Sequence, residues 1–491
     1  MTTDAILDVL SMGELLQHIF QYCDPRGNLQ NALVTKSWSD EALSVLWRDI
    51  RSLRPLFSLL APVGQRINPW QDLELDRPIR STDWVIFHKY SWRVHHILLP
   101  ERSPKFSDST LLEIAFTRPP GALLPNLRSL RLFPSFSHFT PLFLHEGLVA
   151  LDITMSPAQS YGMMSVLTYL PDRCPHLKQL TLESSSDGTP VDIRLDDVLT
   201  FLPYLTLLRI SPVILTPQLM QNIALLPRLE HLNLSDPSYG KSLTIPSLPH
   251  NGFSSITTLK LSHSFKDVAL FLESCPLRDL RNLTIIHSKT ESTKLYLRVL
   301  ETSISRCPKL KRMKLVGKMR FEQSLLQLSH RNALSLRDIS MTADAIAHIA
   351  RILPSLQQLS LSHSSRSRDQ PLPPISMLPT LGSMCPRLTK LRIDMDTSSG
   401  ALAHITGGTL SFPCLEELNV GYSYLDSPVT EVAAFLSGIL RDGCCLLRAR
   451  LNAEHDIYES WQPVIDLLPV LIRIRNAERE AAANVGAPST S

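Results

Sequence analysis

The chain lacks the signals that mark membrane-spanning and secreted proteins, and it has little net charge. No run of about 18 uncharged apolar residues is present, so we expect no membrane partner. The net charge is +3 over 491 residues, which gives no bulk attraction to nucleic acid. The opening residues are acidic early and have no basic segment, so we expect no secretory signal and an intracellular location, cytoplasmic, nuclear or both.

Motifs for catalysis, cofactors and metals are also missing. The eight cysteines form no CxxC pair, and we expect them to be reduced thiols in an intracellular protein. None of the sixteen histidines lies in HExxH, no GxSxG nucleophile turn is complete, and the segment 235–242 has serine where a phosphate-binding loop needs its first glycine. We therefore expect a protein that is not an enzyme and that carries no cofactor and no metal.

A short apolar phrase recurs along most of the chain. In each copy, apolar residues occupy the first, fourth and sixth positions, as Leu127, Leu130 and Leu132 do. The clear copies begin at Leu127, Leu177, Leu205, Leu229, Ile256, Leu280, Leu310, Leu336, Leu356, Leu388 and Leu415, and weaker copies begin at Val94, Leu148 and Leu446. The mean step is about 27 residues, within the range of leucine-rich repeats.

Each repeat predicts one strand and one returning helix. The last two apolar residues of a phrase are two apart, which is typical of a strand with one buried face. The stretches between phrases carry helical spacing, as in residues 219–226 and 345–353. Because such units bury their apolar faces only against neighbours, we expect an α/β leucine-rich-repeat solenoid, a curved parallel sheet with outer helices.

Proline and cysteine occupy fixed places in the repeat. Eight copies have Pro two residues before the first apolar anchor, where it ends the preceding helix. The residue before that Pro is Leu, Phe or Cys, so Cys174, Cys307 and Cys385 share one slot. Because these repeats are far apart along the stack, the three thiols cannot converge on one metal ion, and we expect them to be buried.

The first 90 residues differ in composition from the repeats. They hold four of the six tryptophans, and Trp92 follows directly. Residues 12–22 place Leu15, Leu16, Ile19 and Phe20 on one helical face, and two further short helical stretches follow by residue 48. Three short helices bury little surface alone, so one interpretation is an N-terminal cap for the solenoid.

The second interpretation is a family resemblance. Residues 12–50 resemble an F-box, in the form common in filamentous and mushroom-forming fungi. The matching elements are Glu14-Leu15-Leu16, Ile19-Phe20, Asp24-Pro25, Ala32-Leu33-Val34, Trp38 and Leu46-Trp47-Arg48, while Met12-Gly13 stands where Leu-Pro is usual. Residues 83–99 resemble the segment that leads into the repeats of such proteins.

The resemblance implies a substrate-recognition subunit of a cullin–RING ubiquitin ligase of the SCF type. The F-box would dock a Skp-family adaptor, which links to cullin and a RING subunit, and the repeats would hold a protein substrate. The implied adaptor-binding residues are Met12, Gly13, Glu14, Leu15, Leu16, Ile19, Phe20, Leu33, Val34 and Trp38. The alternative is a non-catalytic interaction scaffold whose N-terminal helices only cap the solenoid.

The residue between the last two anchors of each phrase should point to the exposed sheet face. Six of the thirteen residues in that row are basic and one is acidic, which suits an acidic or phosphorylated protein segment. A solvated polar face is the alternative. The candidate substrate-binding residues in the row are Arg131, Arg209, Lys260, Lys314 and Arg392. The inserts 236–252 and 362–378 should project from one edge of the sheet.

These patterns predict a domain plan. We expect an F-box in residues 1–50, a linker or N-terminal cap in 51–90, the solenoid in 91–455, a C-terminal cap helix in 456–476 and a disordered tail in 477–491.

Overall fold

A computed structural model gives the structure of the chain. It describes residues 12–64, 72–100, 103–133, 139–155, 160–184, 195, 198–235, 248–249, 252–275, 277–287, 293–320, 333–340, 343–352, 354–362, 372–398, 411–448 and 460–485. The inserts expected to project, apart from their ends, therefore lie outside the described residues. The chain divides into two compact units, Met1–His231 and Leu232–Ser491, and each is described by itself.

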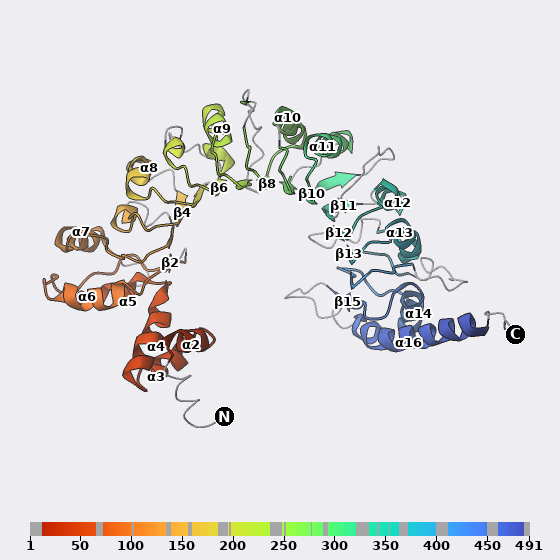
Figure 1. The fold of residues 1–491 in the computed structure, drawn as a ribbon, viewed down its shortest axis with the longest axis horizontal. Helices are drawn as coiled ribbons and strands as arrows, with labels where there is room; N and C mark the ends of the chain where they lie inside the picture. Colours follow the sequence, from red (N-terminus) through yellow and green to blue (C-terminus); the bar gives the residue numbers. More distant parts are fainter. Residues whose placement is uncertain are drawn as a thin grey trace. The chain divides into compact units, whose positions relative to one another are not determined.

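The first unit begins with three helices and continues as alternating strands and helices (Figure 1). Its helices are α2 (Gly13–Phe20), α3 (Pro25–Asn31), α4 (Lys36–Arg48), α5 (Leu53–Phe57), α6 (Asp83–Ser91), α7 (Asp108–Thr117), α8 (Ser160–Arg173) and α9 (Pro217–Ala224). Its strands are β1 (Asp49–Ile50), β2 (His96–Leu98), β3 (Ser129–Leu132), β4 (Ala150–Met155), β5 (Gln179–Ser184) and β6 (Leu207–Ile210). These strands pair in chain order and all run parallel.

The second unit repeats the same alternation. Its strands are β7 (His231–Leu234), β8 (Thr258–Leu261), β9 (Asn282–Ile286), β10 (Arg312–Arg320), β11 (Ala333–Ser340), β12 (Gln358–Ser362), β13 (Lys390–Ile393), β14 (Glu417–Asn419) and β15 (Cys445–Leu447). Its helices are α10 (Phe265–Ser274), α11 (Thr293–Arg306), α12 (Ala343–Ile352), α13 (Leu378–Met384), α14 (Val429–Ile439) and α16 (Gln462–Val485). Strands β8 to β15 pair in chain order and run parallel. The helix α16 extends into the range expected to be disordered.

The repeat phrase builds the core as expected. In both units the helices between successive strands lie on one side of them (Figure 1), and the apolar anchors are buried. Leu130, Leu180 and Leu208 are fully buried in the first unit, as are Leu259 and Ile285 in the second. The α/β parallel-sheet architecture is therefore confirmed, and each strand exposes its other face.

The proline and cysteine slots behave as predicted. Helix α8 ends at Arg173, α11 at Arg306 and α13 at Met384, each two residues before the repeat's proline. Cys174, Cys307 and Cys385, which directly precede these prolines, are fully buried and not disulfide-bonded. Cysteine thus fills the apolar slot that leucine fills in other repeats.

Two repeats have a different register from the predicted one. Leu334 and Leu336 of β11 pair with Met313 and Leu315 of β10, so the repeat uses this apolar pair and not Ile339 and Met341. The outward residue level with Lys314 is therefore Ser335, and Ser340 lies further along the strand. Residues 334–341 contain two pairs of apolar residues, each pair two positions apart. Pairing of β11 with the adjacent strands β10 and β12 selects the first pair, Leu334 and Leu336.

The last repeat is shifted as well. Leu446 pairs with Leu418, the middle anchor of its phrase, whereas the sequence pattern predicted that Leu446 aligns with the first anchor. The outward position level with Asn419 is consequently Leu447, which is 40% exposed. Arg450, expected at that position, lies outside the described residues.

Candidate functional site

Capping side chains fix the starts of two of the three N-terminal helices. Asp24 accepts a hydrogen bond from the Gly27 amide at 2.6 Å and Pro25 occupies the first turn of α3, a favourable helix start. Thr35 caps α4 in the same way through the Trp38 amide, at 3.2 Å. The sequence therefore fixes where α3 and α4 begin, whereas α2 follows Met12 without a side-chain cap.

These helices share a small core. Leu16 and Phe20 of α2 are 1% and 2% exposed and pack with Ala42 of α4, with Trp38 partly buried beside them. The rings of Phe20 and Trp38 are 5.4 Å apart in an edge contact. Three of the candidate adaptor-binding residues, Leu16, Phe20 and Trp38, thus hold the helices together.

The remaining apolar candidates lie on the surface. Leu15 and Ile19, one turn apart on α2, are 41% and 46% exposed, and Met12 is 57% exposed. Leu33 and Val34, just after α3, are 86% and 57% exposed. We name these five residues the apolar face. Exposed apolar groups gathered on one small module are typical of an interface.

The other two candidates lie at the start of α2. The Glu14 side chain is exposed, and Gly13 is half-buried against Glu41. A Cβ atom at Gly13 would come within 2.6 Å of Glu41 Oε1. A larger residue at position 13 would therefore displace the end of the Glu41 side chain, which is flexible, and no backbone atom of α4.

A different surface joins α4 to the repeats. Arg93 donates to the Asp40 carbonyl at 2.6 Å, and its Nη2 forms an ion pair with Asp40 Oδ1 at 3.0 Å. The rings of Trp47 and Tyr90 are 5.0 Å apart, and β1 pairs with β2. These contacts therefore use α4 and β1, and the five residues of the apolar face remain between 41% and 86% exposed.

On the sheet, strand pairing decides which candidate basic residues are already neutralised. In the first unit Arg131 pairs with Asp152 at 2.6 Å and Arg209 with Glu183 at 2.7 Å. Lys260, in the second unit, faces the same way on β8. Two of the five candidate basic residues, Arg131 and Arg209, are thus neutralised by acidic residues on adjacent strands.

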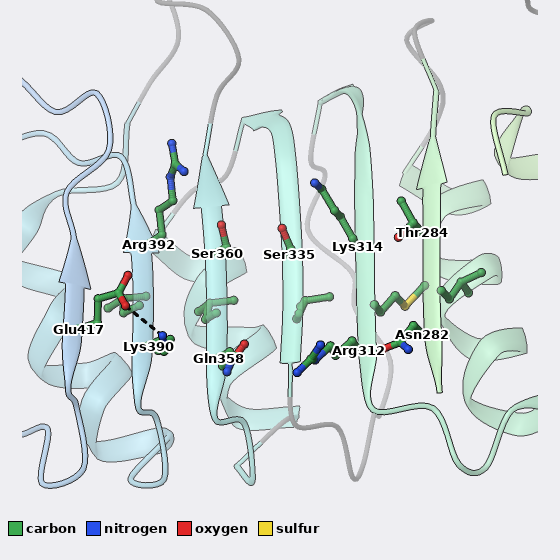
Figure 2. A pocket seen from close by; sticks show the side chains of 15 residues that line it. Asn282, Thr284, Arg312, Lys314, Ser335, Gln358, Ser360, Lys390, Arg392 and Glu417 are labelled. Atoms are coloured by element: carbon green, nitrogen blue, oxygen red, sulfur yellow. Dashed lines mark ion pairs between the residues drawn. The ribbon is translucent and has the colours of Figure 1, made fainter. Parts of the chain in front are cut away.

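In the second unit the exposed sheet face is hollowed over β9 to β14 into a pocket of about 390 Å³ (Figure 2). We name it the sheet-face trough. Two rows of outward side chains line it: Asn282, Arg312, Gln358, Lys390 and Glu417 in one, and Thr284, Lys314, Ser335, Ser360 and Arg392 in the other. The residues between the rows, such as Met313 and Leu359, have their side chains buried on the helix side.

The trough has cationic sides and a hydroxyl-bearing middle. Lys314 and Arg312 project from β10, and Lys390 and Arg392 from β13, while Ser335 and Ser360 lie on the strands between them (Figure 2). Lys390 pairs with Glu417 at 3.1 Å.

Sequence reasoning placed Lys314 and Arg392 in this row but missed Arg312 and Lys390. These two lie two residues earlier on the same strands. The period of 2 along a strand, applied once more, would have found them.

Comparisons place no function on these sites. No known protein family matches the chain, and a comparison with curated proteins finds no match. Among solved structures, the crystal structure of the Rad7 and Elc1 complex in yeast contains a similar chain, with 15% identity and a TM-score of 0.30 over 64% of this chain and 83% of that one. Among the described residues, no helix is long and apolar enough to cross a membrane.

Proposed function

We propose that the chain is the substrate-recognition subunit of an SCF-type ubiquitin ligase, acting inside the cell and without catalysis of its own. The N-terminal helices dock a Skp-family adaptor, and the adaptor links them to cullin and RING subunits. The exposed sheet face holds a protein substrate. The resemblance of residues 12–50 to an F-box supports this proposal.

The apolar face is the single observation that carries it. A cap needs only the surface that contacts the repeats, and α4 and β1 supply that surface. Leu15, Ile19 and Leu33 are not among the residues that make these contacts, and they expose 41%, 46% and 86% of their surface. A partner that covers them would gain the hydrophobic free energy that the chain alone leaves unused.

Co-purification with a Skp-family adaptor tests the proposal. The variant Leu15→Asp/Ile19→Asp should lose binding by about 100-fold or more, because it places two charges in an apolar interface. Both side chains are exposed, so the helices should stay folded, which circular dichroism checks. Leu16→Asp is unsuitable because Leu16 is buried in the helical core.

Helix α7 offers a matched control. Leu112 and Phe116 have the same one-turn spacing and are 49% and 84% exposed, but they lie outside the F-box-like segment. Leu112→Asp/Phe116→Asp should retain the adaptor. Equal retention by both double variants would leave the scaffold with capping helices as the better account.

A further inference from the structure

The last described helix has two apolar sides, and its packing uses one of them. Helix α16 lies along α14 in the second unit (Figure 1). The side that packs there consists of Val464, Leu468 and Ile472, which are at most 3% exposed. Trp461, just before the helix, is 1% exposed, and its indole nitrogen donates to the Ser423 carbonyl at 2.9 Å. These contacts fix the direction in which the rest of α16 points.

The second apolar side consists of residues three and four apart. They are Leu467, Val470, Leu471 and Ile474, and we name them the α16 stripe. At about 100° per residue, the stripe lies roughly 115° around the helix from the side that packs on α14. Val470 and Ile474 are 44% and 50% exposed, and the two leucines are half-buried. Because the terminal element of a repeat array needs a polar outer face, an apolar one indicates a partner.

A charged residue of each sign flanks the stripe. Asp466 and Arg473 are seven residues apart, so they project in nearly the same direction, beside Val470. Both are exposed, and neither forms an ion pair with another described residue. Asp466 accepts a hydrogen bond from the Gln462 amide at 2.7 Å, and Arg473 Nε donates to the Pro469 carbonyl at 3.3 Å. Both charges are therefore accessible to a partner.

The stripe is complementary to itself when two such helices run antiparallel. A two-fold axis between positions 470 and 471 places Leu467 opposite Ile474 of a second copy, and Val470 opposite Leu471. The same axis brings Asp466 within two residues of the level of Arg473 in the second copy, about 3 Å along the helix. The two-fold symmetry forms this pair of opposite charges twice. A parallel arrangement would instead put like charges at the same level.

We propose that the α16 stripe joins two copies of this chain as an antiparallel, two-fold symmetric pair. Such a contact uses the same surface on both copies. Four side chains over about 10 Å of helix make a small interface, so the Kd should be micromolar, about 1–100 µM. The inference does not rest on the proposed function, because it uses no residue of the apolar face or of the sheet face.

Sedimentation equilibrium of the full chain tests the proposal. Between about 1 and 200 µM, the wild-type chain should pass from monomer to dimer. Val470→Asp/Ile474→Asp should raise the Kd by about 30-fold or more, because it places four carboxylates in an apolar contact. The matched control, Leu15→Asp/Ile19→Asp, makes the same change at the same spacing on α2, at residues that are 41% and 46% exposed. This control should dimerise as the wild-type chain does.

Charge reversal tests the antiparallel arrangement. Asp466→Arg and Arg473→Asp should each weaken the dimer by about 3-fold or more, because either change makes both flanking contacts repulsive. An equimolar mixture of the two single variants should recover the wild-type affinity, because each arginine then faces an aspartate. Both positions are exposed, so the fold should persist, which circular dichroism checks.

Three outcomes would contradict the proposal. A wild-type chain that stays monomeric at about 200 µM would overturn it and leave the stripe to a different protein. Equal dimerisation of the wild-type chain and the α16 double variant, or loss of the dimer in the α2 control alone, would place self-association elsewhere and overturn it too. Single charge reversals that leave the Kd unchanged would refute the antiparallel pairing.

Discussion

Arg93 holds α4 mainly through the backbone of Asp40: its Nη1 donates to the Asp40 carbonyl at 2.6 Å, while Nη2 lies 3.0 Å from the carboxylate. It also donates to Ser44 Oγ. The Arg93 side chain is 8% exposed, whereas that of Asp40 is 60% exposed. The buried arginine, more than its exposed ion-pair partner, should therefore fix the N-terminal helices to the repeats.

Two alanine substitutions distinguish these roles. Arg93→Ala should lower the free energy of unfolding by about 2–4 kcal/mol, because it removes a buried, multiply bonded side chain. Asp40→Ala should cost less than about 1 kcal/mol, since exposed ion pairs contribute little. Urea denaturation followed by circular dichroism measures both, and equal losses would contradict this division.

Leu15 and Leu16 are neighbours with opposite surroundings, 41% and 1% exposed. Leu16→Ala should destabilise the N-terminal helices by about 2–4 kcal/mol through the cavity it leaves. Leu15→Ala should change stability by less than about 0.5 kcal/mol, as an exposed position does. Hydrogen exchange of the α2 and α4 amides resolves the local effect, and protection lost in the Leu15 variant would show that this residue belongs to the core.

The cysteines should divide by reactivity. Burial raises the pKa of the Cys174 and Cys385 thiols to about 11, so at pH 8 only about one thiol in a thousand is ionised. Cys23, Cys414 and Cys445 are exposed. Iodoacetamide at pH 8 should therefore label the exposed three in the native protein and spare the buried pair, as read by mass spectrometry. In urea all five should react, and native labelling of Cys174 would refute the slot assignment.

Gly421 has a left-handed backbone (φ +56), and an added Cβ would clash with Asp394 Oδ1. That oxygen accepts the Tyr422 amide at 2.9 Å, so the clash also breaks a turn bond. Gly421→Ala should cost about 2–4 kcal/mol, combining backbone strain and the clash. At Gly443, also left-handed (φ +79) but with nothing within 4 Å, alanine should cost only about 1–2 kcal/mol. Thermal melts compare the two, and equal shifts would show that Asp394 yields freely.

Local patterns determined the repeat architecture. Each phrase carries its strand signal in two apolar residues two apart, and each proline ends its helix by removing a backbone donor. These effects act within one repeat, so they are readable without a structure. The burial of Cys307 followed from the same logic, because leucine fills that slot elsewhere.

Strand register required the tertiary structure. Residues 334–341 hold two apolar pairs of the same period, and either could serve as anchors. Pairing of Leu334 with Met313 on one side and Leu359 on the other selects the first pair. Registers of this kind are set by neighbours about 25 residues away in sequence, so no local pattern reveals them.

The candidate sites also depend on contacts between residues that are distant in the sequence. The sequence determined by itself that the sheet face is rich in basic residues and that α2 has an apolar side. Only the structure decided that Arg131 is neutralised by Asp152 while Lys314 and Arg392 flank two serines, and that Leu15 is exposed while Leu16 is core. Ion pairing and burial depend on which distant side chains meet, and that is a property of the packed repeats.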